Sequence, residues 1–261
     1  MKATKEIWDN FWDKYKFSTK EDKSIIRQEA HSVRWKKIEK KIVNRHGSFK
    51  ELDVAEIGSG RGEVSALMAQ RGANVTLIDY SEVALGKAKE LFNNIGVNAN
   101  FLKADIRDIP KHLLNSFDVS MSFGLVEHFD YPLRRDMVKL HGDLLKPGGI
   151  SFIAVPNTWC VPYRFFMKLS KMLGYCSEGF EVPFSRSELK KIAVSAGFGP
   201  YEIVGSSLIR DSVYFLFSRY ISHLAKWKLI IDTSVFEIPS VFDDYLGYSL
   251  VLIGFKGGEI S

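Results

Sequence analysis

Residues 53–63 read Asp-Val-Ala-Glu-Ile-Gly-Ser-Gly-Arg-Gly-Glu, and this stretch decides the fold. A short apolar run that enters a glycine-rich turn is typical of a strand whose carboxyl end meets a ligand. Gly58, Gly60 and Gly62 can adopt backbone angles that are closed to other residues, and they leave no side chain between main chain and ligand. We therefore expect a strand at 52–57 and a ligand-binding turn directly after it.

An acidic residue, Asp79, closes the next apolar run, which starts at Val75. In nucleotide-binding α/β folds a carboxylate at this strand end grips a ribose. The spacing of the first turn then selects the nucleotide. A dinucleotide turn has the spacing Gly-x-Gly-x-x-Gly, whereas here Glu63 occupies the third glycine position and the glycines run Gly-x-Gly-x-Gly. This spacing disfavours a nicotinamide-dependent oxidoreductase.

The composition is that of a globular protein, with 46% apolar residues in a chain of 261. Two cysteines, Cys160 and Cys176, cannot build a disulfide framework, and no Cys/His cluster has zinc spacing, so we predict no metal site. No apolar stretch reaches the roughly 20 residues that a membrane span needs, and the N-terminus lacks an apolar signal core. We expect a cytoplasmic protein.

The N-terminal region carries most of the net positive charge. Residues 1–46 contain 13 Lys and Arg against 7 Asp and Glu, while the whole chain has a net charge of +5. We interpret this excess as a solvated helix face. The alternative is contact with an anionic lipid, a nucleic acid or an acidic substrate.

Large apolar side chains recur at helical spacing near the N-terminus, which predicts a helix over 5–17. A second helix is expected over 21–45. The residues of the first stripe are Ile7, Trp8, Phe11, Trp12 and Tyr15. Either the stripe packs on the body of the protein, or residues 1–46 form an arm that covers a ligand. In the second case Trp12 and Tyr15 are candidates for contact with a substrate.

From residue 52 onward the pattern alternates between short apolar runs and amphipathic segments. This alternation implies an α/β fold, with a parallel sheet and helices on both faces. The predicted strands are 52–57, 74–79, 99–104, 117–122, 149–155, 201–206 and 248–256. The predicted helices are 61–71, 82–95, 131–145 and 186–197.

Two segments, 157–184 and 207–247, exceed the length that connections need, and both are rich in aromatic and basic residues. We expect them to be helical insertions in a domain that spans 47–261. As a cap over the acceptor, they would bring Trp159 and Tyr163 to the acceptor pocket.

In an open α/β sheet, ligands bind beyond the carboxyl ends of the strands. The polar and small residues at four predicted strand ends are therefore candidates for binding a nucleotide. They are Glu56, Gly58, Ser59, Gly60, Gly62, Asp79, Tyr80, Asp105, Ile106, Phe123 and Gly124. Three have structural alternatives, since Gly58 could serve only packing, Asp79 could cap a helix, and Asp105 could be a turn residue.

The glycine turn, preceded by Glu56 and followed by the acid at Asp79, resembles the first motif of class I S-adenosylmethionine-dependent methyltransferases. The resemblance covers roughly residues 50–156 and 185–256. It implies a Rossmann-like, mostly parallel seven-stranded sheet with an antiparallel last strand. It also implies S-adenosylmethionine as cofactor, with S-adenosylhomocysteine as product.

The same resemblance implies a role for each matching position. The motif glycines would pack against the methionine moiety, and Asp79 would hold both ribose hydroxyls. Asp105 would meet the adenine amino group, and the main chain near Phe123 and Gly124 would meet the methionyl end.

The phrase Gly124-Leu125-Val126-Glu127-His128-Phe129 resembles one found in methyltransferases of small molecules and lipids. Enzymes that methylate exocyclic amines of nucleic acids carry Asp/Asn-Pro-Pro-aromatic there, so a nucleic-acid partner is disfavoured. His128 is our candidate general base, because imidazole can accept a proton near neutral pH. The alternative is a structural histidine.

The leading hypothesis is a methyltransferase that acts on oxygen or nitrogen of a small-molecule acceptor. A second hypothesis places the acceptor in a lipid or isoprenoid, with residues 163–168 and 214–228 in peripheral contact with an anionic membrane. A third is a non-catalytic nucleotide-binding module. The sequence indicates no oligomeric state.

Overall fold

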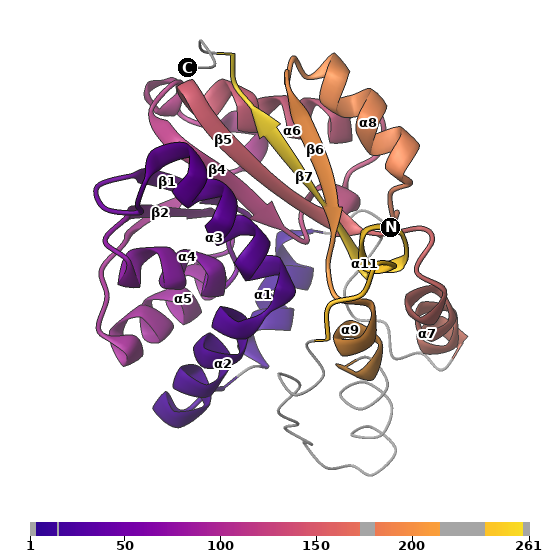
Figure 1. Ribbon diagram of the computed structural model, residues 1–261. Coiled ribbons are helices and arrows are strands. Elements are labelled where there is room, and N and C mark those ends of the chain that lie inside the picture. Colours follow the sequence, from indigo (N-terminus) through magenta and orange to yellow (C-terminus); the bar gives the residue numbers. More distant parts are fainter. Residues whose placement is uncertain (1–3, 15, 173–180, 215–237, 258–261) are drawn as a thin grey trace.

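A seven-stranded sheet forms the centre of the computed structural model, which describes residues 4–14, 16–172, 181–214 and 238–257 (Figure 1). The strand order is β3-β2-β1-β4-β5-β7-β6, and β7 runs antiparallel to both of its neighbours. This arrangement confirms the predicted Rossmann-like fold. The strands are β1 (Asp53–Ile57), β2 (Asn74–Asp79), β3 (Asn100–Lys103), β4 (Phe117–Phe123), β5 (Leu145–Pro156), β6 (Tyr201–Gly205) and β7 (Ser249–Phe255).

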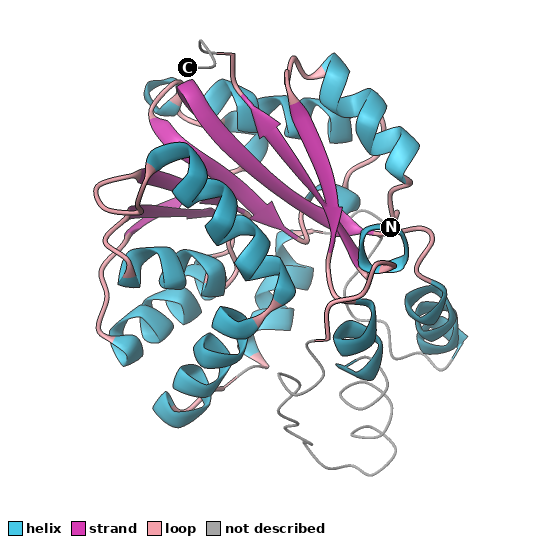
Figure 2. Cartoon of the chain, viewed as in Figure 1, coloured by secondary structure: helices cyan, strands magenta, loops and turns pink. Residues whose placement is uncertain are grey.

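Helices cover both faces of the sheet (Figures 1 and 2). Successive residues of a strand point to opposite faces. On β5, Phe152 belongs to the cluster that includes α3 (Val33–His46), α4 (Glu63–Gln70) and α5 (Glu82–Ile95). Its neighbour Ile153 belongs to the cluster with α6 (Leu133–Leu144) and α8 (Arg186–Ser195). The core is therefore two apolar layers separated by the sheet.

The helix predicted over 21–45 is in fact two helices, α2 (Thr19–His31) and α3, which meet at Ser32. Ser32 has an extended backbone, with φ −65° and ψ 146°, and its hydroxyl accepts a hydrogen bond from the amide of Trp35 at 2.9 Å. A serine that caps the following helix in this way ends the preceding one. The prediction failed because apolar periodicity continues across the break.

The first helix, α1, spans Lys5–Asp13 and is shorter than the predicted 5–17. Tyr15 lies outside the described residues. The fifth strand, in contrast, begins earlier than the predicted residue 149. Leu145 already pairs with Phe117, and the register then shifts before Val119 pairs with Ile150. Residues 146–149, Lys-Pro-Gly-Gly, thus form an irregularity within β5.

The two predicted insertions contain helices of their own. Residues 157–184 include α7 (Val161–Met172), and residues 207–247 include α9 (Leu208–Tyr214) and α11 (Asp243–Leu246). The aromatic residues Phe215, Phe217, Tyr220 and Trp227 of the second insertion lie outside the described residues. Single 3₁₀ turns η1 (Ile106–Asp108), η2 (Lys111–Leu113) and η3 (Val126–His128) are the remaining elements of the described residues. In the part of the chain that is described, no helix combines the length and apolarity needed to cross a membrane.

Candidate active site

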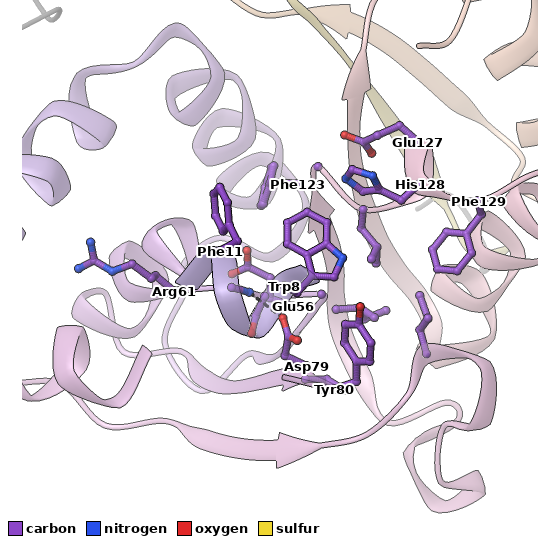
Figure 3. A pocket seen from close by; sticks show the side chains of 18 of the residues that line it. Trp8, Phe11, Glu56, Arg61, Asp79, Tyr80, Phe123, Glu127, His128 and Phe129 are labelled. Carbon is purple, nitrogen blue, oxygen red and sulfur yellow. Dashed lines mark hydrogen bonds between the residues drawn. The ribbon is translucent and has the colours of Figure 1, made fainter. Parts of the chain in front are cut away.

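A cavity of about 440 Å³ opens at the carboxyl ends of β1, β2 and β4, where the strand order reverses (Figure 3). This is the edge at which open α/β sheets bind ligands. Most of the residues that the sequence singled out line the cavity. They are Trp12, Glu56, Gly58, Ser59, Gly60, Asp79, Tyr80, Asp105, Ile106, Phe123, Gly124 and His128.

Two glycines of the turn are needed at the cavity wall because other side chains pack closely against them. Gly58 and Gly60 have φ of +60° and +53°, which side chains disfavour. A Cβ at Gly58 would lie 2.6 Å from Leu125, and one at Gly60 would lie 2.5 Å from the ring of Trp12. Gly62 does not line the cavity, because a Cβ there would instead lie 2.1 Å from Leu77. Its role is to let α4 pack against the sheet.

Asp79 is held rigidly at the end of β2, with its side chain in the cavity wall. Its two carboxylate oxygens accept hydrogen bonds from the amides of Gly60, at 3.0 Å, and Ser81, at 2.9 Å. Burial raises the pKa of Asp79, and the backbone amides oppose that rise. Ser81, whose hydroxyl accepts from the amide of Ala84, is the cap of α5. The capping alternative for Asp79 is therefore wrong.

Asp105 combines a turn role with a place in the cavity wall. It caps η1 by accepting a hydrogen bond from the amide of Arg107 at 2.9 Å, and the Arg107 guanidinium pairs with the same carboxylate. This pairing lowers the pKa of Asp105. Tyr80 lies nearby, and burial raises the pKa of its hydroxyl to about 12, so the hydroxyl stays protonated.

Glu56 is buried at the floor of the cavity and accepts a hydrogen bond from the hydroxyl of Ser65. Burial raises the pKa of Glu56 to about 8. Without a ligand, this carboxyl therefore carries a proton at neutral pH. Arg34 of α3 also lines the cavity, with its guanidinium 4.9 Å from the ring of Phe123 and paired with Glu29 at 2.8 Å.

Helix α1 lies over the cavity, and the aromatic stripe of the sequence faces inward (Figure 3). Trp8 and Phe11 line the cavity together with Trp12, and the Trp8 ring meets the His128 ring edge-on, with centroids 5.0 Å apart. Asp9 ties the helix to the sheet edge by accepting a hydrogen bond from the Ser81 hydroxyl at 2.5 Å. The stripe itself was the signal that could have assigned Trp8 and Phe11 to the site.

At the other end of the cavity, Glu127, His128 and Glu181 gather. One ligand atom of each lies within 4.8 Å of the others, so the group could hold a metal ion. The amide of Val182 donates to the carbonyl of Glu127 at 3.0 Å, which places Glu181 beside η3. Glu181 comes from an insertion, and no sequence motif linked it to the site.

The two aromatic residues predicted for the acceptor pocket do not line the cavity. Trp159 is 63% exposed and is not among the lining residues. Tyr163 is buried, packs against Tyr248 with ring centroids 5.1 Å apart, and donates a hydrogen bond to Glu181 at 2.8 Å. Its contact with the site is indirect. Further lining residues that the sequence analysis did not assign to the site include Trp8, Phe11, Arg34, Arg61, Arg107, Glu181 and Tyr248.

The hydrogen-bonding groups of the glycine turn fit a nucleoside that carries a polar substituent. The Ser59 hydroxyl is buried in the wall and has no hydrogen-bond partner among the described residues. Buried hydroxyls normally have partners, so an orphan in a cavity wall favours a polar ligand. The absence of a Cβ at Gly58 and Gly60 lets Leu125 and the Trp12 ring pack directly against the turn at the cavity wall.

Comparison with known proteins identifies the family. Residues 54–149 match the family described as "Methyltransferase domain". The ubiquinone biosynthesis O-methyltransferase of Dechloromonas aromatica (strain RCB) is 31% identical over 158 residues, which cover 59% of this chain and 67% of that one. This chain belongs to the class I S-adenosylmethionine-dependent methyltransferases. A further methyltransferase of the same name, from Nitrosospira multiformis (strain ATCC 25196 / NCIMB 11849 / C 71), is 28% identical over 63% of this chain and 70% of its own.

Solved structures agree on the methyltransferase fold. Magnesium protoporphyrin IX methyltransferase from Synechocystis PCC 6803, with bound SAH, has a TM-score of 0.59 and 16% identity, and covers 97% of this chain and 93% of that chain. A putative methyltransferase from Haloferax volcanii, in complex with the Trm112 activator, has a TM-score of 0.63 and 14% identity over 99% and 100% of the two chains. At these identities the likeness concerns the fold alone.

Proposed function

We propose that this methyltransferase transfers the methyl group of S-adenosylmethionine to a hydroxyl oxygen of a small-molecule acceptor in the cytoplasm. One observation carries the proposal: a single cavity joins the strand-end residues suited to the donor with the imidazole of His128. The names of the relatives, which are O-methyltransferases, support oxygen over nitrogen. The low cysteine count supports a reducing compartment.

The donor half of the cavity consists of the glycine turn and the ends of β2 and β3. Asp79, already oriented by two backbone amides, would accept hydrogen bonds from the ribose hydroxyls. Asp105 would accept from the adenine amine, beside the apolar plate of Ile106. The Ser59 hydroxyl and the Arg34 guanidinium would meet the methionyl carboxylate, near the main chain of Phe123 and Gly124 and the buried Glu56.

The bound donor supplies an electrophilic methyl group on a sulfonium sulfur. The protein then needs mainly to hold the acceptor oxygen in line with that methyl group, and such orientation is worth roughly 7–11 kcal/mol. His128 would take the hydroxyl proton as the new carbon–oxygen bond forms, while the bond between the methyl carbon and sulfur breaks and S-adenosylhomocysteine leaves. One carboxylate oxygen each of Glu127 and Glu181 lies within 4.8 Å of an imidazole nitrogen of His128.

Methyl transfer to matched acceptors tests the proposal. Purified protein with methyl-labelled S-adenosylmethionine is offered phenols and alcohols, each paired with its own methyl ether and with the corresponding amine. We expect label in the hydroxyl compounds and none in the ethers. Label in the amines alone would assign the enzyme to nitrogen, and donor binding without any transfer would favour the non-catalytic module.

A second candidate, a lipid or isoprenoid acceptor at a membrane surface, is favoured by helix α7. The helix exposes Val161, Phe165 and Met172, whose exposed fractions are 72%, 62% and 74%. Exposed basic side chains, Arg164 and Lys168, lie on the same helix. An apolar face flanked by basic residues is the pattern of a helix that lies on an anionic bilayer.

Liposome co-sedimentation separates the two candidates. Phe165→Ser should reduce binding to vesicles that contain anionic lipid, whereas Val194→Ser should not, since Val194 is a similarly exposed apolar residue on α8. Binding should also weaken as salt screens the charges. If neither variant changes sedimentation, or if anionic lipid makes no difference, the membrane candidate is removed.

A further inference from the structure

Arg61 sits in the middle of the glycine turn and contributes to the cavity lining, but its guanidinium points away from the other labelled side chains (Figure 3). The side chain is 3% exposed, so its charge has been taken out of water. Burying a charged group is costly unless a partner compensates it. The partner lies behind the turn, on the N-terminal helices.

The guanidinium of Arg61 donates to the carboxylate of Asp22 on α2, and its carbon lies 3.8 Å from the centroid of the Phe17 ring. Asp22 is 1% exposed and accepts a second hydrogen bond, from the Asn94 side chain of α5, at 2.7 Å. The start of α2 is fixed by a capping box between Ser18 and Glu21. Asp22 thus joins the turn, α2 and α5 at one point.

Ser59 and Gly60, which precede Arg61 in the turn, line the cavity. The amide of Gly60 donates to Asp79 at 3.0 Å, and the amide of Gly62 donates to the carbonyl of Ser59 at 2.9 Å. Glycines leave a turn with many accessible conformations, which a side-chain anchor restricts. The position of the Ser59 and Gly60 main chain therefore depends on where Arg61 is held.

We propose that Arg61 and Asp22 are positioning residues that set the affinity for the methyl donor. The ion pair between Arg61 and Asp22 fixes the glycine turn to helix α2. The turn is therefore already in the conformation that binds S-adenosylmethionine before the ligand arrives. Preorganisation of this kind increases affinity by lowering the ordering cost of binding. The inference rests on the proposed placement of the donor at this turn.

The test uses the full chain with Asp22→Asn, Arg61→Gln and the double variant. Calorimetry with S-adenosylhomocysteine should show about tenfold weaker binding for each single variant. Because the two residues act as one unit, the double variant should bind no more weakly than either single variant. The KM for the donor should rise, while kcat at saturating donor and the KM for the acceptor stay within about twofold of wild type.

A matched control lies at the other end of α4. Arg71 donates to Glu39 of α3 at 2.9 Å and stacks over Trp35, but it is far from the glycine turn along the helix. Glu39→Gln should lower the melting temperature without changing donor affinity. Arg61→Lys, which keeps the charge, should recover part of the lost affinity and provides a milder variant if Arg61→Gln folds poorly.

Two outcomes would count against these ideas in different ways. If the Asp22 and Arg61 variants lower the melting temperature as Glu39→Gln does, while donor affinity stays within about twofold of wild type, the pair is merely structural and the inference is wrong. If the wild-type protein itself does not bind S-adenosylhomocysteine, the donor placement fails instead.

Discussion

The two halves of the cavity are built by different means. In the donor half, the ligand-facing groups sit at the ends of consecutive strands, and backbone amides orient Asp79. The proposed acceptor half is the end of the cavity formed by Glu127, His128 and Glu181. There, Glu181 comes from an insertion and is held by a hydrogen bond from Tyr163 and by the backbone hydrogen bond of Val182 to Glu127. The first arrangement follows from the topology of the sheet. The second depends on contacts between segments far apart in the chain.

The largest effect is expected in the acceptor half, from His128→Ala. Loss of a general base typically lowers kcat by about 10²–10⁴-fold, because no side chain is then positioned to remove the hydroxyl proton of the methyl acceptor. Donor affinity should stay near wild type, and steady-state kinetics with calorimetry would show both. His112→Ala, which removes an exposed histidine outside the cavity, is the control. Equal kcat in the two variants would exclude His128 from catalysis.

The next largest effect belongs to the donor half. Asp79→Ala should weaken binding of S-adenosylhomocysteine at least about tenfold, or 1.4 kcal/mol, by removing the acceptor of the ribose hydroxyls. Asp53→Ala is a suitable comparison, since Asp53 begins β1 at the opposite edge of the sheet and pairs with Lys146. Unchanged affinity after Asp79→Ala would refute the ribose assignment.

The same contrast explains how much the sequence could predict. Strand positions, the glycine turn and Asp79 follow local rules of pattern and spacing, so they were found without structure. The break at Ser32 was missed because one capping hydrogen bond overrides a continuous apolar period. Glu181 and Arg34 were missed because their place in the cavity depends on tertiary contacts that leave no local pattern.

Trp159 shows the limit of reading composition in an insertion. An aromatic residue in a long insertion suggested an acceptor contact, but Trp159 is mostly exposed and lies outside the cavity lining. Just before it, the Asn157 side chain donates hydrogen bonds to the carbonyls of Tyr245 and Gly247. Helix α1 instead contributes Trp8, Phe11 and Trp12 to the cavity wall. Residue type alone did not distinguish these two sources of aromatic surface.

A smaller effect, on stability, is expected from Glu56 at the floor of the donor half. Its pKa is raised from 4.5 to about 8 when folded, so between these values the folded state keeps a proton that the unfolded state has lost. The free energy of unfolding should therefore fall as pH rises through this window and level off above it. Glu56→Gln lacks this titration.

The measurement is the melting temperature of the ligand-free protein across that pH range, compared with Glu56→Gln. Wild type should lose stability relative to the variant, by several degrees, as pH rises. Other titrating groups are common to both proteins and cancel in the difference. A difference that does not change with pH would show that Glu56 ionises normally in the folded state.

The smallest expected effect comes from replacing single aromatic residues, Trp8 of helix α1 and Trp159 of the first insertion. Trp8→Ala should raise the KM for donor or acceptor by several-fold, because the Trp8 ring lines the cavity and contacts His128. Trp159→Ala should leave both KM values and kcat within about twofold of wild type, since a mostly exposed side chain outside the cavity loses little on truncation. Steady-state kinetics of the two variants, with melting temperatures to confirm folding, make the comparison. A larger defect in Trp159→Ala than in Trp8→Ala would mean that the first insertion moves over the cavity during turnover, so that the acceptor half is completed by a rearrangement and not by α1.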